Sequence, residues 1–583
     1  MHSSEKETFE KLTYLIQQNI TNPAFSLSSI CKELGISRTQ LHRIVTAHSQ
    51  LPITLYIRKV KMLKAKDLLL NTDMRVSEIT YEVGIDSPQN FSKYFTQEFN
   101  VNPTEFRKQS QTEEVSTVTD LEVSIAVLPF VNMSSDPEQD FFCDGMTEEI
   151  INRLAQVSGL KIAGRTSSFA FKGQNLDVRQ IGQQLNVSFV LEGSLRKSGN
   201  KLRITAQLNK VADGFNVWSE KYDREAEDVF DIQDEISLSI LNRIKSNVLV
   251  TEKVAVLKRY TNNPEAYRLY LYGRFYYNKF AGADNFYKAI DYYQAAIAIE
   301  PSYAIAYSGM ASCFLNLWFY RYASATQCLP QMQQCAQYSL ELDDQIAESH
   351  LAIARLKMYY EWDLVGALRS FQKALEQNHN MAEAHGQYAL CLSILGEVPR
   401  AIDHAQTAFD LDPFSLINNF YTGYIYWIAG DFRKALVQGR RLLELEPNFW
   451  GGHIIMGFNL IKSKQYNEAL AELEKALRQN YSGLTLSGYG SLLALVGHQE
   501  KAREVIQKME VLHQTQPVAN YDMGIVHACL GDKDTAYDFF EKAIALREPP
   551  MLFFPFIVRD WLAHFKEDSR YKTLLEKTIL KAR

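Results

Sequence analysis

The spacing of hydrophobic residues divides the chain into three regions. In residues 1–108, and again from about residue 255 onward, apolar side chains recur every three or four positions, which is the spacing that buries one face of an α-helix. Between residues 122 and 250, short apolar runs and alternating apolar and polar residues predict β-strands separated by a few helices. We therefore expect a multidomain, mainly α-helical protein with one small α/β domain. The polar segment 109–121 predicts a linker.

Within the first region, the segment Leu34–His48 predicts a helix–turn–helix unit. Gly35 suits the left-handed backbone of a tight turn between two helices. Ser37 can then cap the second helix, and Gln40, three residues later, completes a capping box.

The segment Val83–Phe99 repeats this design. Gly84 supplies the turn, Ser87 the cap, and Pro88 fits the first helical position. A long helix joins the two units, and five apolar residues predict its buried face: Leu55, Val60, Leu63, Leu68 and Leu69. At about 1.5 Å per residue, this helix spans about 27 Å and can hold two recognition helices near one turn of a DNA duplex apart.

Basic residues concentrate in the same region. Seven of them, and no acidic residue, lie between Leu34 and Lys66: Arg38, Arg43, Arg58, Lys59, Lys61, Lys64 and Lys66. Phosphates attract such a surface, and the release of counterions drives the binding. The first 110 residues carry a net charge of +3 and the remainder −9, for −6 in the whole chain of 583 residues. A basic head in front of an acidic body fits a regulator that places one end on DNA.

Residues 7–108 resemble the DNA-binding domain of the AraC/XylS family of bacterial transcription regulators. The resemblance rests on ISRTQLHRIV, YIRKVKMLKAKDLLL, VSEITYEVGIDSPQNFSKYF and NPTEFR, in this order and spacing. It implies that Thr39, His42 and Arg43 of the first recognition helix, and Gln89, Asn90 and Lys93 of the second, meet base edges. Arg suits guanine, and Gln or Asn suits adenine. We expect DNA contacts from these six residues and from Arg38 and Gln40, with Lys59, Lys61 and Lys64 on phosphates.

The segment departs from the family pattern at three places. Val45 stands where the family usually has Phe, Ile85 follows Gly84 where Phe is common, and Thr96–Gln97 replaces a basic pair. The last change removes phosphate contacts, so the second unit is expected to bind more weakly. The alternative is a plain helical bundle with a solvated basic face.

In residues 122–250, strands are expected in VSIAVLPFVNM and LKIAGRTSSFAF and in alternating segments broken at Ser198–Asn200 and Asp213–Gly214, with helices on one face of the sheet. The pieces IAVLPF, DGMTEEI, RTSSFAFKG, VLEGSLRKSGNKLRITAQL and VWSEKYDR make this block similar to the small α/β domain related to the N-terminal domain of TolB. That domain often lies between a signalling or DNA-binding module and a repeat array, including in proteins described as adenylate cyclases. We interpret its polar residues as strand-face salt bridges, with a ligand pocket as the alternative: Arg165, Ser167, Glu192 and Arg203.

From about Pro264 the chain repeats with a period of 34 residues. Ala367, Ala401, Ala435 and Ala469 keep this spacing, glycines stand five positions before several of the repeat alanines, and prolines stand twelve positions after some. This is the tetratricopeptide pattern. We expect seven or eight helix pairs in residues 255–546, stacked into a solenoid with a concave groove for a protein or peptide partner, a longer loop near Phe319–Pro330, and a cap at 547–583.

No apolar run is long enough to cross a membrane, the first residues contain no signal-peptide core, and seven dispersed cysteines predict buried thiols in a reducing cytoplasm. Catalytic motifs and metal-ligand spacings are absent from the sequence, so we expect neither an enzyme nor a cofactor. The main hypothesis is a cytoplasmic, sequence-specific transcription regulator that binds double-stranded promoter DNA. The alternatives are a repeat scaffold with a non-essential DNA-binding head, and a nucleotide-acting enzyme that uses the α/β domain.

Overall fold

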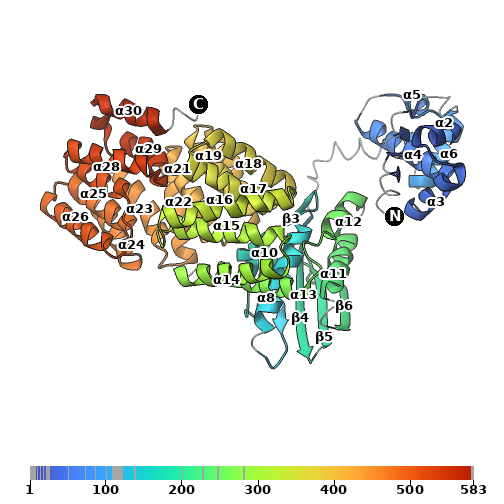
Figure 1. The fold of residues 1–583 in the computed structure, drawn as a ribbon, viewed down its shortest axis with the longest axis horizontal. Helices are drawn as coiled ribbons and strands as arrows, with labels where there is room; N and C mark the ends of the chain where they lie inside the picture. The colour runs from blue at the N-terminus through green and yellow to red at the C-terminus, as the bar shows by residue number, and fades with distance from the viewer. Residues whose placement is uncertain are drawn as a thin grey trace. The chain divides into compact units, whose positions relative to one another are not determined.

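The computed structural model consists of two compact units, Met1–Leu121 and Glu122–Arg583, shown in Figure 1. The structure describes residues 8–9, 11–12, 15–16, 19–21, 27–49, 52–71, 74–85, 87–99, 102–104, 106–107, 123–136, 139–199, 201–225, 229–245, 248–279 and 282–578. The predicted linker at 109–121 lies outside the described residues. The predicted fold class is confirmed: a helical head, a small sheet region and a long helical array follow one another along the chain.

The head contains two helix–turn–helix units, as predicted. They are formed by α2 (Leu27–Leu34) with α3 (Arg38–Ser49), and by α5 (Val76–Glu82) with α6 (Pro88–Phe99), and α4 (Ile53–Asn71) joins them. Gly35 and Gly84 adopt left-handed backbone angles, with φ of 66° and 63°, in the two turns. The glycines therefore permit the sharp change of direction before each recognition helix.

Each helix–turn–helix unit has its own hydrophobic core, and α4 contributes to both. Ile53 and Val60 from the first half of α4 pack with the first unit, whereas Met62, Ala65 and Leu69 from its second half pack with the second unit. A rigid rod that is buried at both ends fixes the two units relative to each other.

The predicted apolar face of α4 was wrong at two positions. Leu55 and Leu63 are 37% and 50% exposed, whereas Val60 and Leu69 are buried and Leu68 is partly buried. The buried stripe passes through Ile53 and Met62 instead, because α4 turns from one core to the other along its length. The prediction placed all the leucines on one face and therefore missed the change from one core to the other along α4.

The second compact unit of the chain, Glu122–Arg583, begins with a sheet. Its strand order is β3–β1–β4–β5–β6, and a short strand, β2, also pairs with β4. The strands β1, β3 and β4 run parallel, and β4, β5 and β6 form an antiparallel meander. Gly199 and Gly214 take positive φ in the two hairpin turns, as the sequence predicted. The strand bounds are β1 Val123–Val127, β2 Val131–Asn132, β3 Leu160–Ile162, β4 Phe189–Ser198, β5 Lys201–Lys210 and β6 Asn216–Glu225.

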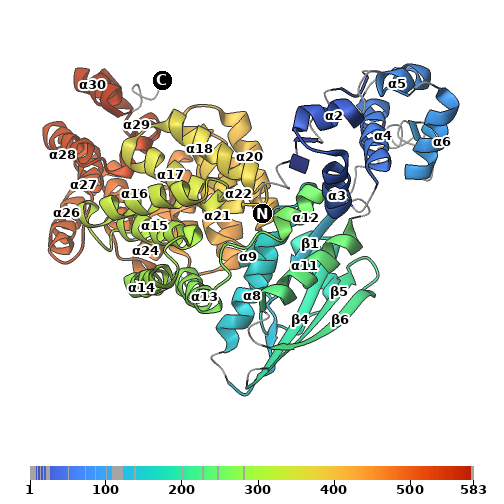
Figure 2. The same cartoon turned by 45° about the vertical axis from the view of Figure 1, so that its right-hand side comes forward.

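Helices cover both faces of this sheet, although the sequence predicted them on one face. The helices α8 (Gln139–Leu154) and α11 (Val229–Ile244) pack on the face that carries Ile125 and Leu191 (Figure 2). Helix α10 (Val178–Leu185) packs on the opposite face, against Ala126 and Val190. The predicted second strand is also shorter than expected, since α9 (Arg165–Phe169) follows β3 directly.

After α12 (Val250–Val256), the described residues form eight helix pairs, in agreement with the predicted seven or eight. The repeat alanines lie at the contacts within the pairs and are fully buried, as at Ala367, Ala401 and Ala435. The pairs are α13 (Pro264–Asn278) with α14 (Ala283–Ile299), α15 (Ala304–Phe319) with α16 (Ala325–Leu342), α17 (Ala347–Leu356) with α18 (Leu364–Gln377), α19 (Ala382–Ile394) with α20 (Val398–Leu411), α21 (Leu416–Ile428) with α22 (Phe432–Leu445), α23 (Trp450–Lys462) with α24 (Tyr466–Gln479), α25 (Gly483–Leu495) with α26 (Gln499–His513), and α27 (Asn520–Cys529) with α28 (Lys533–Ala545).

The turn inside most pairs needs a left-handed residue five positions before the repeat alanine. Glycine takes this position in four pairs, for example Gly396 with φ of 84° and Gly430 with φ of 78°. Lys464 and Trp362 hold the same position in two other pairs, with φ of 59° and 57°. The fold therefore imposes the turn even where the sequence offers no glycine.

The longer loop predicted near Phe319–Pro330 is not present. Only residues 320–324 connect α15 to α16, and Pro330 lies inside α16. The extra residues lengthen helices instead, since α16 has 18 residues and α20 has 14. Additional helical turns bury apolar side chains that a loop would leave in water.

The C-terminal segment does more than cap the last pair. It comprises η3 (Pro549–Phe553), α29 (Phe554–Asp560), η4 (Ala563–Glu567) and α30 (Ser569–Thr578). Arg559 donates hydrogen bonds to the carbonyl oxygens of Ile428 (2.7 Å) and Trp427 (3.1 Å) at the end of α21. Asp560 pairs with Lys462 at the end of α23 (3.1 Å). The segment therefore contacts the ends of α21 and α23 as well as the last helix pair.

The winding of the solenoid brings distant pairs together. Arg321, after α15, pairs with the buried Asp522 of α27 at 2.5 Å. Arg547 donates to the carbonyl oxygen of Glu361 at 2.8 Å and lies over the ring of Trp362. These contacts link the second and third pairs to the eighth.

The α/β domain is docked on the solenoid through the turns that precede α19 and α21. The amide group of Asn380 donates to the carbonyl oxygens of Ala155 (2.9 Å) and Leu160 (2.8 Å) and accepts from the backbone of Ile162 (3.1 Å). Two of the three bonds satisfy backbone groups of the edge strand β3, so the solenoid covers this edge of the sheet.

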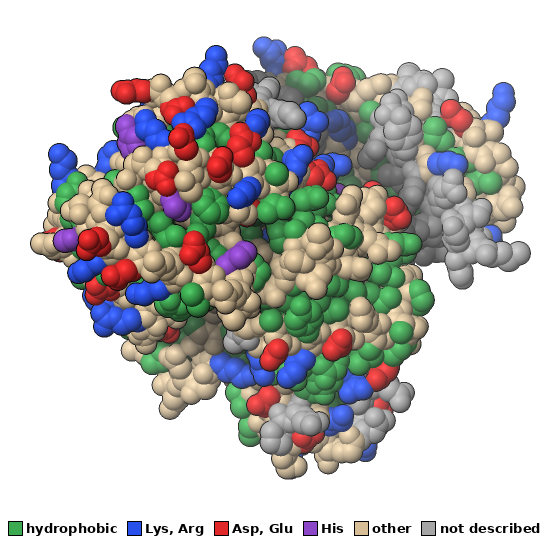
Figure 3. Space-filling model, turned by 60° about the vertical axis from the view of Figure 1, so that its left-hand side comes forward, with side chains coloured by type: hydrophobic (Ala, Val, Ile, Leu, Met, Phe, Trp, Pro, Cys, Tyr) green, Lys and Arg blue, Asp and Glu red, His purple; other side chains and the backbone are tan. Residues whose placement is uncertain are grey.

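On the face shown in Figure 3, charged side chains of both signs surround one area in which hydrophobic side chains gather. No helix in the described part of the chain is both long and apolar enough to span a bilayer. All seven cysteines are free thiols, and five of them are buried.

Candidate nucleic-acid interface

The N-terminal turn of α3 presents its polar side chains to solvent. Ser37 and Gln40 form the predicted capping box, since Gln40 N donates to Ser37 Oγ (3.2 Å) and Ser37 N donates to Gln40 Oε1 (3.0 Å). Arg38, Thr39, His42 and Arg43 are exposed, while the opposite face of the helix is buried through Leu41, Ile44 and Val45. Arg38 also donates to Ser28 Oγ at 2.8 Å, which ties the start of α3 to α2. The capping box uses the Gln40 side chain locally.

Helix α6 has the same construction. Ser87 Oγ accepts from Asn90 N at 3.2 Å, as predicted for its cap. Gln89, Asn90 and Lys93 are exposed, and Phe91 and Phe95 anchor the other face with their rings 5.8 Å apart. Each recognition helix therefore combines a buried apolar side with an exposed side that carries donors and acceptors.

The turn before α6 is held in place by a lysine from α4. The Lys61 ammonium donates to the carbonyl oxygen of Gly84 at 2.7 Å. A Cβ atom at Gly84 would lie 2.2 Å from the carbonyl oxygen of Ile20, so the turn also packs tightly on the first part of the chain. Lys61 is half-buried and serves the fold, which distinguishes it from the other two lysines expected to contact phosphates.

Lys59 and Lys64 lie on the exposed side of α4. Lys59 pairs with Glu98 of α6 at 3.7 Å, and Arg58 lies 4.6 Å from the ring centre of Tyr94. A pair between exposed charges contributes about 0–1 kcal/mol, so a phosphate can compete with Glu98 for Lys59.

The three departures from the family pattern have different structural roles. Val45 and Ile85 are buried and replace larger rings within the two cores. Thr96 is exposed, and the side chain of Gln97 lies outside the described residues.

In the α/β domain, two of the four predicted polar residues make strand-face contacts. Arg203 pairs with Asp223 across β5 and β6 at 2.6 Å, and Glu192 accepts from Asn209 at 2.8 Å. Burial raises the pKa of Glu192, and the hydrogen bond from Asn209 opposes this effect.

The other two, Arg165 and Ser167, lie on the helix α9 and not on a strand, so the strand-face interpretation was wrong for them. Arg165 pairs at 3.0 Å with Glu148, which Arg274 of α13 also contacts. Burial alone would raise the pKa of Glu148, but Arg274 and Arg165 outweigh it and lower the pKa. Sequence reasoning could not find Arg274 or Asp412, the partner of Ser167, because both stand far along the chain: Arg274 is within the repeat helix α13, and Asp412 is in the turn after α20.

Two family models match parts of the chain. A helix-turn-helix domain model matches residues 30–109, and a model of the second domain of HilA/YgeH-like transcriptional regulators matches residues 121–238. Together they cover most of the head and most of the α/β domain.

Similar proteins match parts of this chain. The Rhizobium meliloti (strain 1021) protein named "Putative adenylate cyclase 3" is 37% identical over 232 residues, which are 40% of this chain and 39% of that protein. The Msm operon regulatory protein of Streptococcus mutans serotype c is 35% identical over 85 residues, 15% of this chain and 31% of that protein. The chain thus spans well under half of either relative. The solved C-terminal domain of AraT, a response regulator from Geobacillus stearothermophilus, is 26% identical, with 18% of this chain and 84% of that chain covered and a TM-score of 0.17.

Proposed function

We propose that this chain is a cytoplasmic, sequence-specific transcription regulator whose head, residues 1–108, binds double-stranded promoter DNA. The observation that carries the proposal is the pair of capped helices, α3 and α6, each with a buried apolar side and an exposed polar side, held by the two-core rod α4. The helix-turn-helix model and the regulatory relative support it.

In this proposal the exposed side chains of α3 and α6 read base edges in the major groove. Arg38, Thr39, His42 and Arg43 act from α3, and Gln89, Asn90 and Lys93 act from α6, with Arg43 suited to guanine and Asn90 to adenine. Gln40 contributes through the capping box that orients the helix. Lys59 and Lys64 contact phosphates, whereas Lys61 supports the turn at Gly84.

Gel shifts of the full chain against genomic fragments test the proposal. Arg43→Ala and Lys93→Ala should each weaken binding to the selected fragment by about 1–3 kcal/mol, or roughly 5- to 150-fold. Lys508→Ala removes an exposed lysine from α26 of the solenoid and should leave the affinity unchanged. Binding to no fragment at low salt, or equal affinity of all four proteins, would contradict the proposal.

We further propose that residues 122–250 and 255–546, with the cap 547–583, sense or assemble through a protein or peptide partner. The resemblance of the α/β block to the TolB N-terminal domain remains a prediction. The rival function is a repeat scaffold with a non-essential DNA-binding head. If deletion of residues 1–108 abolishes DNA binding, the regulator is supported; if the deletion leaves DNA binding unchanged, the head is dispensable and the rival stands.

We propose no enzymatic activity. The two matched models support this view, since they cover residues 30–109 and 121–238, which are most of the chain before the repeats. The relative named as an adenylate cyclase is matched over only 39% of its length, so we do not propose an adenylate cyclase activity for this chain. Equilibrium dialysis of the chain with nucleotides tests the alternative.

A further inference from the structure

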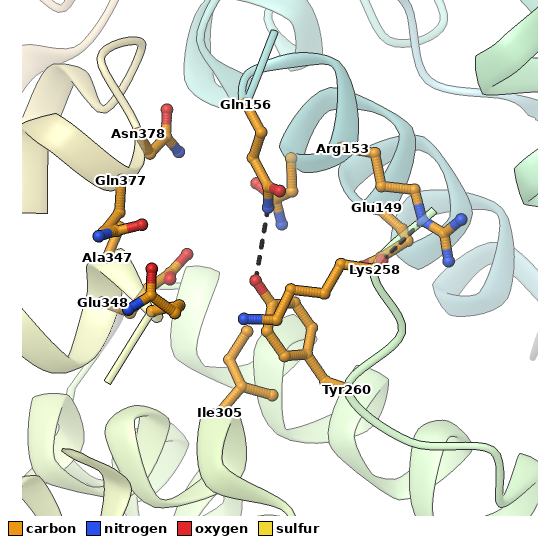
Figure 4. A pocket seen from close by; sticks show the side chains of 12 residues that line it. Glu149, Arg153, Gln156, Lys258, Tyr260, Ile305, Ala347, Glu348, Gln377 and Asn378 are labelled. Carbon is orange, nitrogen blue, oxygen red and sulfur yellow. Dashed lines mark hydrogen bonds and ion pairs between the residues drawn. The ribbon is translucent and has the colours of Figure 1, made fainter. Parts of the chain in front are cut away.

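A pocket lies where α8 of the α/β domain meets the solenoid (Figure 4). Its volume is about 440 Å³, counting space that is open to solvent. The lining comes from α8, from the segment before α13, and from the ends of α15, α17 and α18, so five elements meet at one place. The polar residues in its lining include Glu149, Asn152, Arg153, Gln156, Lys258, Tyr260, Glu348 and Gln377.

The two cations of this lining already have acidic partners. Arg153 pairs with Glu149 at 3.0 Å and also with Asp234. Lys258 pairs with Asp343 at 2.8 Å. The positive charges at the pocket are therefore neutralised by the protein itself.

Unlike Arg153 and Lys258, the lining residue Glu348 has no ion-pair partner among the described residues. It is the second residue of α17, and no side chain among the described residues forms an ion pair or a hydrogen bond with its carboxylate. Burial raises the pKa of this carboxyl, and the nearby Glu149 and Glu148 raise it further, against opposing effects of its own backbone amide and Arg274. The carboxylate at this wall of the pocket therefore has no ion-pair partner among the described residues, and only the more distant Arg274 offsets its charge.

Uncharged hydrogen-bonding groups line the same pocket as Glu348. Gln156, which follows α8, donates to the Tyr260 hydroxyl at 3.4 Å, a long bond that a ligand can replace. Asn152 and Gln377 also line the pocket, from opposite sides of the domain contact. A ligand that is cationic at one end and polar along its body matches this set of groups.

We propose that this pocket binds a small primary amine that also carries hydroxyl or amide groups, with its ammonium on Glu348 and its polar body against Asn152, Tyr260 and Gln377. Such a ligand bridges α8 and α17 and stabilises the docking of the α/β domain on the solenoid. The site lies wholly in the compact unit Glu122–Arg583, so it does not depend on DNA binding by the head.

Thermal unfolding and calorimetric titration of the full chain with ethanolamine test this site. Ethanolamine has an ammonium and a hydroxyl, and choline keeps the charge and the hydroxyl but loses the N–H donors. Ethanolamine should bind saturably at millimolar concentration and raise the unfolding temperature, and choline should not. Glu348→Gln should reduce the affinity for ethanolamine at least about tenfold, because it removes a charge-assisted hydrogen bond.

Two further variants keep the outcome clear. Glu376→Gln removes an exposed carboxylate one position before Gln377 and should bind ethanolamine like the unchanged protein. Gln377→Ala removes a lining group without changing charge and should also weaken binding, even if Glu348→Gln folds poorly. The absence of saturable binding, equal responses to ethanolamine and choline, or equal affinities of the Glu376 and Glu348 variants would overturn the proposal.

Discussion

The hydroxyl of Ser167 donates a hydrogen bond of 2.5 Å to the carboxylate of Asp412, a residue 245 positions further along the chain. The same carboxylate oxygen accepts from the backbone N–H of Ser167 at 2.8 Å, and Ser167 Oγ accepts from the N–H of Phe414 at 2.9 Å. Gly164 can approach only because it lacks a side chain, since a Cβ atom there would lie 2.6 Å from Asp412. This cluster holds the small helix α9 on the turn before α21.

Ser167→Ala should lower the free energy of unfolding by about 1–3 kcal/mol, because it leaves the N–H of Phe414 without its partner and removes one donor from a buried carboxylate. Urea denaturation of the full chain measures the effect. Ser219→Ala, on the exposed face of β6, is the matched control and should cost less than about 0.5 kcal/mol. Equal losses from the two substitutions would show that the cluster does not stabilise the docking.

Asp412→Asn should change how stability depends on pH. Burial raises the pKa of Asp412 above its ordinary value of 3.8, although hydrogen bonds from Ser167 oppose this effect. The folded state therefore holds the proton more tightly than the unfolded state, and the stability that protonation provides is lost as the pH rises from 3.8 through the raised pKa.

The asparagine variant keeps an acceptor oxygen but cannot ionise. Its stability relative to the unchanged protein should therefore increase as the pH rises through this window. Urea denaturation of both proteins at several pH values measures the difference. A difference that is constant, or that falls with pH, would contradict the assignment.

Gly84→Ala should destabilise the second helix–turn–helix unit much more than Gly35→Ala destabilises the first. Both glycines have positive φ, which costs an alanine about 1–2 kcal/mol. Only Gly84 also meets backbone, the carbonyl oxygen of Ile20, whereas nothing lies within 4 Å of a Cβ atom at Gly35.

Hydrogen exchange of the amides in α3 and α6 measures the local stability of each unit in the full chain. Protection in α6 should fall further in Gly84→Ala than protection in α3 falls in Gly35→Ala. Similar losses would mean that the turn at Gly84 relaxes away from Ile20 at little cost.

Lys464→Gly should stabilise the solenoid by up to about 1 kcal/mol. Lys464 holds the left-handed position that glycine takes in four other pairs, and glycine adopts it without the clash of Cβ. Trp362→Gly, at the same position of another pair, should instead destabilise, because Trp362 is buried and stacks with Arg547. Guanidinium denaturation distinguishes the two directions, and destabilisation by Lys464→Gly would show that its backbone is not strained.

Lys64→Ala and Lys61→Ala should separate DNA contact from support of the fold. Loss of one phosphate contact at Lys64 should reduce the slope of log affinity against log salt by about 1, with little effect on stability. Lys61→Ala should lower the stability of the head by about 1 kcal/mol or more, because the Gly84 carbonyl loses its charged donor. Equal salt slopes for Lys64→Ala and the unchanged protein would exclude Lys64 from the phosphate contacts.

The sequence by itself determined the local features of this protein. The capping box of Ser37 and Gln40, the glycine turns at Gly35 and Gly84, and the phase of the repeat alanines depend on hydrogen bonds and contacts between residues close in the chain. Such signals repeat within a few residues, so spacing alone reveals them.

Only the tertiary structure decided the features that join residues far apart. Lys61 donates to Gly84, and Leu55 and Leu63 face solvent. Arg165 pairs with Glu148 of α8, and Ser167 contacts Asp412 of the solenoid, so neither meets a neighbouring strand. Residues expected in a loop near Pro330 belong to the long helix α16. Asn380 covers the edge strand β3 from more than two hundred residues away. These outcomes depend on which surfaces exclude water together once the helices and strands pack, and one-dimensional spacing does not specify that choice.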